Sequence, residues 1–253
     1  MTTPRRDRSA TTAGNAAATG IWLLDRMALA DVLIDIEAAT PRLSADEKQR
    51  AAIMADQQQS RLWIAGRVAL RLLLEAECGA VIRQRSLSLD RSGRPSLAGH
   101  GLDFSVADSG PYMMIGLVEA GRIGVDIERR QALKMAPRRV ELVIAAGEGL
   151  GAATAGALQS WTRIEAFAKA AGPSLAAILS RLGIQGHGEG ILSADIVRTR
   201  SRSARAAAGI EVLDLQLPQG LMGAVARASL AADDRRPPIV RTFDGAEITR
   251  LAR

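Results

Sequence analysis

The stretch that constrains this chain most is Ile123-Gly124-Val125-Asp126-Ile127-Glu128, in which apolar and acidic residues alternate. Such alternation predicts a β-strand, because successive side chains of a strand point to opposite faces of the sheet. Val125 and Ile127 are then expected to face the core. Asp126 and Glu128 are expected to lie side by side on the opposite face. The fold must therefore accommodate two neighbouring carboxylates on one face of a strand.

Two carboxylates placed this close need a compensating cation. At ~5 Å and an effective dielectric constant near 20, two unit charges repel by about 3 kcal/mol. Mg²⁺ would offset this repulsion, because proteins typically hold it with one or two carboxylates together with substrate phosphates. Alternatively, the two acids are solvated at a strand end or are paired with Arg122, Arg129 and Arg130. This stretch by itself leaves both interpretations open.

The composition favours a folded protein with anionic partners. The 253 residues are 47% hydrophobic, enough for one large domain or two small ones with a real core. The chain has 33 Lys and Arg against 27 Asp and Glu, a net charge of +6. This excess favours nucleic acid, phosphorylated small molecules or acidic proteins as partners. The only lysines are Lys48, Lys134 and Lys169, so each position that keeps a lysine is of interest.

Several features predict a cytoplasmic protein without a membrane partner. The most apolar run, Leu62–Leu74, is interrupted by Arg67 and Arg71 and is too short to span a membrane. The N-terminal Arg5-Arg6 is not followed by the compact apolar region of a signal peptide. Cys78 is the only cysteine, so no intrachain disulfide can form, and we expect a buried structural thiol.

Local signals place helices and strands in the first half of the chain. Ser44 opens a capping-box pattern, and Gly79 is expected to end a long helix. On that helix, Arg61, Arg67 and Arg71 form a basic stripe, either a solvated face or an anion-binding one. The expected strands are 21–25, 86–90, 104–110 and 112–119, and the expected helices are 28–39, one from 45 onward and 62–78.

The second half contains one strong helix. Good helix formers fill Trp161–Ala171, and Gly172-Pro173 is expected to stop the helix. Trp161, Glu165 and Lys169 are four residues apart and share one face, although Glu165 and Lys169 could be an ordinary i,i+4 ion pair. A weaker helix is expected over 140–150, and strands over 192–197, 210–217 and 221–226.

Two motifs in combination give the chain a family resemblance. They are Gly124-Val125-Asp126-Ile127-Glu128 and Trp161-x-x-x-Glu165-Ala166-x-x-Lys169-x-x-Gly172. This pair resembles the 4'-phosphopantetheinyl transferase family of the long, surfactin-synthetase type. Gly93-Arg94-Pro95 is similar to the family's Gly-Lys-Pro, and Phe104–Gly110 stands where the family has Phe-Asn-Leu-Ser-His-Ser-Gly. The likeness covers about residues 20–228.

The resemblance implies an α+β fold of two similar α+β halves related by pseudo-twofold symmetry, with the active site between them. We expect a flexible N-terminal tail over residues 1–19 and an N-terminal α+β half over 20–117. A C-terminal half with the metal site is expected over 118–228, and a peripheral C-terminal tail over 229–253. A chain of this long type is expected to be a monomer.

The resemblance also implies an activity, that of a holo-[carrier protein] synthase. Family members transfer the 4'-phosphopantetheine arm of coenzyme A to a serine of an apo acyl or peptidyl carrier protein and release adenosine 3',5'-bisphosphate. Mg²⁺ is then the cofactor and coenzyme A the co-substrate. Carrier proteins are usually acidic, so an Arg-rich surface suits them. Nucleic acid is not expected as a partner.

By motif match, the acidic residues and the lysine acquire roles. Asp126, Glu128 and Glu165 would bind Mg²⁺ together with the pyrophosphate of coenzyme A. Glu165 would also be the general base toward the carrier serine, because a hydroxyl is a poor nucleophile until a base takes its proton. Lys169 would contact the phosphates and stabilise the leaving group, a role that suits its compact ammonium.

Coenzyme A binding is where the chain departs from the family pattern. Arg61, Arg94, Asp108 and Ser109 are the candidate contacts. Asp108 replaces a family His, and a carboxylate there would repel a phosphate by about 1–3 kcal/mol unless a nearby Arg pairs with it. Ile164 replaces a family Lys, which removes one cation.

Two other functions compete with an active, divergent transferase. One is a non-catalytic homologue that binds a carrier protein or nucleotide without transfer. The other is a nucleic-acid binder, suggested only by charge, because the chain has no recognisable binding motif and only 3% aromatic residues for base stacking.

Overall fold

The computed structural model describes residues 20–90, 93–151, 153–185, 192–228 and 238–252, so the predicted N-terminal tail over 1–19 lies outside the described part. The fold is mixed α+β, as expected. The elements are β1 (Gly20–Asp25), α1 (Arg26–Ala39), α2 (Ala45–Ala52), α3 (Gln57–Cys78), η1 (Ala80–Ile82), β2 (Ser88–Leu89), β3 (Pro95–Ser96), β4 (Asp103–Ser109), β5 (Tyr112–Val118), β6 (Ile123–Arg129), α4 (Pro137–Leu150), α5 (Ala157–Ala171), α6 (Leu175–Leu182), α7 (Ala194–Ala208), β7 (Ile210–Asp214), β8 (Leu221–Ala228), β9 (Val240–Thr242) and α8 (Gly245–Leu251).

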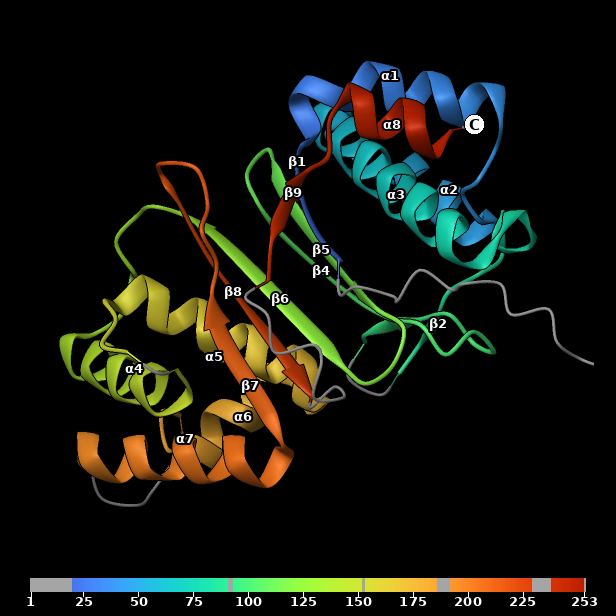
Figure 1. Cartoon of the computed structure of the whole chain (residues 1–253). Coiled ribbons are helices and arrows are strands. Elements are labelled where there is room, and N and C mark those ends of the chain that lie inside the picture. The colour runs from blue at the N-terminus through green and yellow to red at the C-terminus, as the bar shows by residue number, and fades with distance from the viewer. Residues whose placement is uncertain (1–19, 91–92, 152, 186–191, 229–237, 253) are drawn as a thin grey trace, which may run out of the picture.

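Two sheets lie between two groups of helices (Figure 1). The first sheet has the strand order β4-β5-β1-β9 and is covered on its outer face by α1, α3 and α8. The second has the order β6-β8-β7 and is covered by the helices α4 to α7. A third apolar cluster, which includes Ile21, Met114, Val125 and Ile127, fills the space between the sheets.

The two halves share one strand connectivity. In the N-terminal half, β1 is followed by helices and then by β4 and β5, and β1 pairs antiparallel with β5. In the C-terminal half, β6 is followed by helices and then by β7 and β8, and β6 pairs antiparallel with β8. In each half, therefore, the first strand pairs with the last, and the penultimate strand lies beyond it.

The C-terminal segment differs from the expected peripheral tail. β9 pairs in parallel with β1, and α8 packs against α3. Phe243, Ile248 and Leu251 are buried in the N-terminal core. Trp22 on β1 donates a 3.0 Å hydrogen bond from Nε1 to Glu247. Residues 240–251 therefore complete the first half, although they follow the second half in sequence.

Local signals set most element ends. Ser44 and Glu47 form the predicted capping box at the start of α2, and α5 ends at Gly172, whose φ is +98°. The predicted strand over 192–197 is wrong: Ser193 accepts a hydrogen bond from the Ile196 amide and caps α7. The N-cap signal outweighed a short alternation of apolar residues. Cys78 is half-buried rather than buried.

The sheets meet at β4 and β6, which run in the same direction. Side chains of β4 accept the outward amides of β6: Ile123 N–H donates to Asp103 Oδ2 at 2.8 Å, and Val125 N–H donates to Ser105 Oγ at 3.1 Å. Arg129 N–H donates to Ser109 Oγ at 3.0 Å. We call this junction the seam. It satisfies backbone groups of an edge strand without adding another strand.

In the part of the chain that the structure describes, no helix is both long and apolar enough to cross a membrane.

Candidate active site

The two predicted motifs meet where α5 crosses β6. The burial pattern confirms the predicted faces, because Val125 and Ile127 pack between the sheets while Asp126 lies toward α5 and is 3% exposed. The crossing is close at Gly124, where an added Cβ would lie 2.1 Å from the Ala166 carbonyl oxygen. Glycine at this position therefore lets the helix backbone approach the strand.

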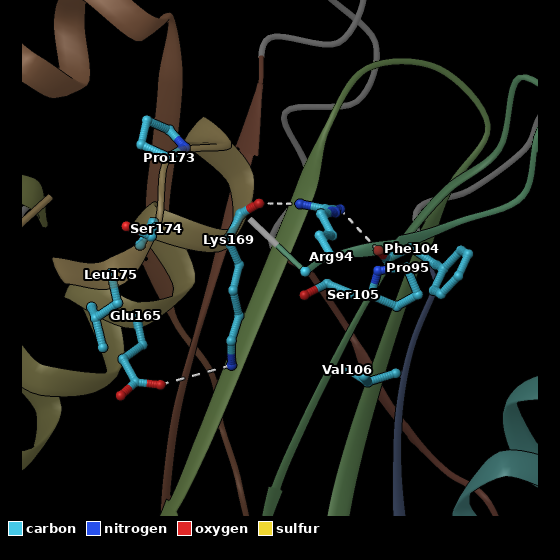
Figure 2. Close-up of a pocket in the computed structure, with 12 residues that line it drawn as sticks. Arg94, Pro95, Phe104, Ser105, Val106, Glu165, Lys169, Pro173, Ser174 and Leu175 are labelled. Atoms are coloured by element: carbon cyan, nitrogen blue, oxygen red, sulfur yellow. Dashed lines mark hydrogen bonds and ion pairs between the residues drawn. The ribbon is translucent and has the colours of Figure 1, made fainter. Parts of the chain in front are cut away.

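The Lys169 side chain runs from its backbone on α5 toward the Glu165 carboxylate (Figure 2). Its Nζ donates to Asp126 Oδ1 at 2.8 Å and to the Val125 carbonyl at 3.1 Å. It lies 3.9 Å from Glu165 Oε2, one turn earlier on the same helix. The Glu165–Lys169 pair is thus part of a larger cluster rather than an isolated surface pair.

Asp126 is incompletely paired. Its Oδ2 atom is buried and has no hydrogen-bond partner. Burial raises the pKa of Asp126 to about 8; Lys169 opposes this rise and Glu165 adds to it. Burial therefore disfavours the charged form of Asp126 more strongly than the single Lys169 ammonium favours it.

Glu128 lies on the same face of β6 and is fixed by the seam. Ser109 donates its hydroxyl to Glu128 Oε2 at 2.8 Å while it accepts the Arg129 amide. Among the described residues, no three His, Cys, Asp or Glu side chains lie together as a ready metal-binding group. The three predicted ligands are therefore near one another but are not gathered around one point.

The donor set nevertheless suits a hard divalent cation. Asp126, Glu128 and Glu165 offer only carboxylate oxygens, which Mg²⁺ prefers. When all are ionised, these three groups and the Lys169 ammonium sum to two negative charges, the complement of a divalent ion. The unpaired Asp126 Oδ2 is an oxygen that such an ion could use without breaking an existing bond.

A cavity of about 210 Å³ adjoins this cluster. Glu165 and Lys169 lie on the wall that α5 forms, while Arg94, Phe104 and Ser105 lie on the opposite wall (Figure 2). Pro173, Ser174 and Leu175, which follow α5, complete the lining. The cavity has apolar walls with a few charged groups at its cluster end, a combination common in small-molecule sites.

Arg94 has partners different from the predicted coenzyme A phosphates. Its Nη2 donates to Asp103 Oδ2 at 2.6 Å, to the Phe104 carbonyl at 2.8 Å and to the Ile123 carbonyl at 2.7 Å. Its Nη1 donates to the Lys169 carbonyl. The guanidinium therefore joins β4, β6 and α5 at the seam, and its side chain is only 11% exposed.

A larger cavity of about 660 Å³ lies beside Asp108 and Gly110. Asp108 forms an ion pair with Arg26 at 3.1 Å. This is the arginine partner that was expected to offset its repulsion of a phosphate. Arg26 also donates to the Gly110 carbonyl at 2.6 Å. Arg50 lines the cavity too, and its guanidinium lies 5.8 Å from the centre of the Trp63 ring.

Arg26, Arg50 and Trp63 are not among the site residues predicted from sequence. They come from three different helices, so no local spacing links them. Two signals in the sequence could have indicated them. Arg50 is a further cation in the Arg-rich N-terminal helices, and Trp63 is one of only three tryptophans in the chain.

One predicted coenzyme A contact, Arg61, and one departure from the family pattern, Ile164, lie away from both cavities. Arg61 pairs with Asp31 of α1 and is not among the residues that line either cavity. Ile164 is fully buried in the core of the C-terminal half. Ile164 packs into this core and does not line the cavity.

Comparison with curated proteins gives a related sequence. No protein-family model matches the chain. Over 154 residues the chain is 31% identical to a protein of Synechocystis sp. that bears the name "Putative 4'-phosphopantetheinyl transferase slr0495". The match covers 55% of this chain and 61% of that relative. The chain thus spans about three fifths of the length of the relative, whose name agrees with the family resemblance of the two motifs.

Proposed function

We propose that this protein is a 4'-phosphopantetheinyl transferase of the long, surfactin-synthetase type. It transfers the 4'-phosphopantetheine arm of coenzyme A to a serine of an apo acyl or peptidyl carrier protein. The serine oxygen forms a bond to the phosphorus that bears the arm, and the bond from this phosphorus to adenosine 3',5'-bisphosphate breaks. The observation that carries the proposal is the cluster of Asp126, Glu165 and Lys169 beside a cavity, where one buried carboxylate oxygen lacks a partner.

The arrangement along the seam suits an extended substrate. The larger cavity, with Arg26 and Arg50, lies at the Asp108 end of β4. The smaller cavity lies beside Phe104 and Ser105, nearer the start of the strand. Asp126 comes between these ends. Coenzyme A would place its nucleotide phosphates near the arginines, its pyrophosphate at the carboxylates and its arm in the smaller cavity.

Each residue of the cluster has a chemical task in this proposal. Asp126, Glu128 and Glu165 would hold Mg²⁺, which would supply charge neutralisation at the pyrophosphate. Glu165, 23% exposed at the cavity, would take the proton of the carrier serine. Lys169 would donate to a phosphate oxygen and stabilise the leaving group. Ser109 would keep the Glu128 carboxylate oriented through its 2.8 Å hydrogen bond.

The other family expectations follow from the same proposal. The shared connectivity of the halves favours the pseudo-twofold relation, and the C-terminal half would supply the metal ligands. The protein would act as a cytoplasmic monomer. The competing function is a homologue that binds coenzyme A or a carrier without transfer, a possibility favoured by the carboxylate of Asp108 in the larger cavity.

Mass spectrometry of apo-carrier proteins tests the proposal. A panel of acyl and peptidyl carriers is incubated with the protein, coenzyme A and Mg²⁺. We expect one carrier or more to gain one phosphopantetheine, and we expect a chelator or the Asp126→Asn variant to abolish the gain. Asp35→Asn is the matched control, because Asp35 is an exposed aspartate on α1 and should leave transfer unchanged.

The outcomes separate the two functions. No mass gain on any carrier, together with calorimetric binding of coenzyme A, would identify a non-catalytic homologue. Transfer by the wild type that persists in Asp126→Asn would contradict the assignment of the site.

A further inference from the structure

The position of Lys169 has a consequence for how the site accepts a metal ion, and this inference rests on the proposed metal site. The Lys169 ammonium contacts Asp126 Oδ1 at 2.8 Å and lies 3.9 Å from Glu165 Oε2. These two carboxylates are also the proposed metal ligands. In this structure the lysine thus occupies the place of a cation between them.

We propose that Lys169 is a resident counter-ion that a divalent cation displaces. The ammonium and the metal compete for the oxygens of Asp126 and Glu165, and binding of the metal releases Lys169 toward the 210 Å³ cavity. An anionic group of a bound substrate can then receive the ammonium. The lysine alternates between a partner in the protein and a partner in the substrate.

The geometry favours exchange over permanent pairing. Asp126 Oδ2 is buried and makes no hydrogen bond, so a cation that reaches this oxygen displaces no existing partner of it. The two cations then repel each other across one carboxylate, which favours departure of the more mobile one. Lys169 is free to move because its side chain is 31% exposed and lines the cavity. Its flexible stem allows the ammonium to swing without a change in α5.

The surrounding contacts leave room for this movement. Lys169 has one further acceptor, the Val125 carbonyl at 3.1 Å, which belongs to the seam. The backbone carbonyl of Lys169 is held by Arg94. The helix is therefore fixed at this residue while the end of the side chain faces the cavity.

Metal binding without coenzyme A or a carrier tests the inference. Mn²⁺ serves as the probe, and its free concentration is measured by electron paramagnetic resonance with the wild type and with Lys169→Met. Removal of the competing charge is expected to tighten Mn²⁺ binding about tenfold. Lys134→Met is the matched control, because Lys134 is an exposed lysine outside both cavities, and its Mn²⁺ affinity should equal that of the wild type.

Thermal unfolding supplies a second readout. Without divalent ions, Lys169→Met should unfold at a lower temperature than the wild type because two carboxylates lose their cation. Saturating Mg²⁺ should raise its unfolding temperature by more than it raises that of the wild type. Lys169→Arg keeps the charge, so its Mn²⁺ affinity should not exceed that of the wild type, and this variant decides the matter if the methionine variant fails to fold.

Two results would overturn the inference. One is equal or weaker Mn²⁺ binding by Lys169→Met, and the other is tight Mn²⁺ binding by Lys169→Arg at the level expected for the methionine variant. Neither measurement uses transfer, so a protein that modifies no carrier would contradict the proposed function alone. An active wild type with an unchanged Mn²⁺ affinity in Lys169→Met would contradict this inference alone.

Discussion

Glu47 in the N-terminal half and Asp126 in the C-terminal half are both buried carboxylates next to a cation on a long helix. Glu47 contacts Arg67 and Arg71, and both of its oxygens accept hydrogen bonds. Asp126 contacts one lysine and keeps one oxygen without a partner. Saturated pairing marks the first as a structural anchor, and incomplete pairing marks the second as a candidate site.

The pKa values of the two carboxyls shift in opposite directions, in agreement with this difference in pairing. Burial raises the pKa of Glu47, but attraction to Arg67 and Arg71 and a hydrogen bond from the Ser44 amide outweigh burial and hold the pKa below its usual value. The pKa of Asp126 is raised because burial there outweighs the single lysine. A buried acid is thus informative about function only when its partners are counted.

Glu47→Gln should produce the largest loss of stability. It leaves Arg71, which is fully buried, without its main counter-charge. We expect unfolding to become easier by about 3–5 kcal/mol, the usual consequence of removing one partner from a buried pair. Urea unfolding followed by circular dichroism measures this. A change below about 1 kcal/mol would mean that Arg71 finds another acceptor and that the pair is not an anchor.

Asp126→Asn should have a small effect on stability and a large effect on activity. It removes a carboxyl whose burial disfavours its charge, while the amide oxygen can still accept from Lys169. We expect the free energy of unfolding to change by less than about 1 kcal/mol while carrier modification is lost. Destabilisation as large as that of Glu47→Gln would break the distinction between the two carboxylates.

Gly124→Ala should damage both stability and transfer. The added Cβ would lie 2.1 Å from the Ala166 carbonyl oxygen, so α5 must move away from β6. We expect a loss of about 1–3 kcal/mol, typical of overpacking, together with reduced transfer as Glu165 and Lys169 shift. Gly245→Ala is the control, because a Cβ at Gly245 meets nothing within 4 Å. Equal stability of the two variants would show that the helix does not need this close approach.

Arg94→Lys should weaken the seam by an intermediate amount. A lysine can keep the ion pair with Asp103 but cannot also donate to the Phe104, Ile123 and Lys169 carbonyls. We expect a loss of about 1–2 kcal/mol in urea unfolding. A raised KM for coenzyme A with unchanged stability would instead support the phosphate-binding role that the motif resemblance implies.

The smallest expected effect is a difference in the pH dependence of stability between the wild type and Glu47→Gln. The folded-state pKa of Glu47 lies below its usual value of 4.5. Its contribution to the free energy of unfolding is therefore complete above pH 4.5 and is lost as the pH falls through the lower, folded-state pKa. Wild-type stability should therefore decline below about pH 4.5. Urea unfolding from pH 3 to pH 7 should show a shallower decline for Glu47→Gln, and parallel curves would contradict this assignment.

Local sequence was sufficient for the elements that build the centre of the site. Alternation in Ile123–Glu128 predicted the strand and its two faces, and the residues around Gly172 predicted the end of α5. Such features depend on neighbours in sequence. Their physical basis, side-chain direction and backbone freedom, is contained in a few residues.

Features that depend on distant partners were not predictable in this way. Arg71 was expected on a basic stripe, yet Glu47, 24 residues earlier, draws it into the core. The resemblance predicts that Arg94 contacts a phosphate of coenzyme A, and the structure adds partners on β4, β6 and α5 that no local pattern indicates. β9 is too short to have a recognisable pattern, and only its pairing with β1 gives it a place. Arginine is difficult to assign from sequence because it serves equally well as a buried anchor and as an anion ligand.

The seam also determines whether β6 presents an open edge to other molecules. β6 is an edge strand rich in apolar residues, the kind of strand that recruits strands from other molecules. Asp103, Ser105 and Ser109 occupy its outward amides with side chains, which offer no continuing edge for a further chain. If the halves part, β6 regains an open edge while each half is still folded. Solutions of the protein are therefore expected to become turbid under conditions that open the seam, before either half unfolds.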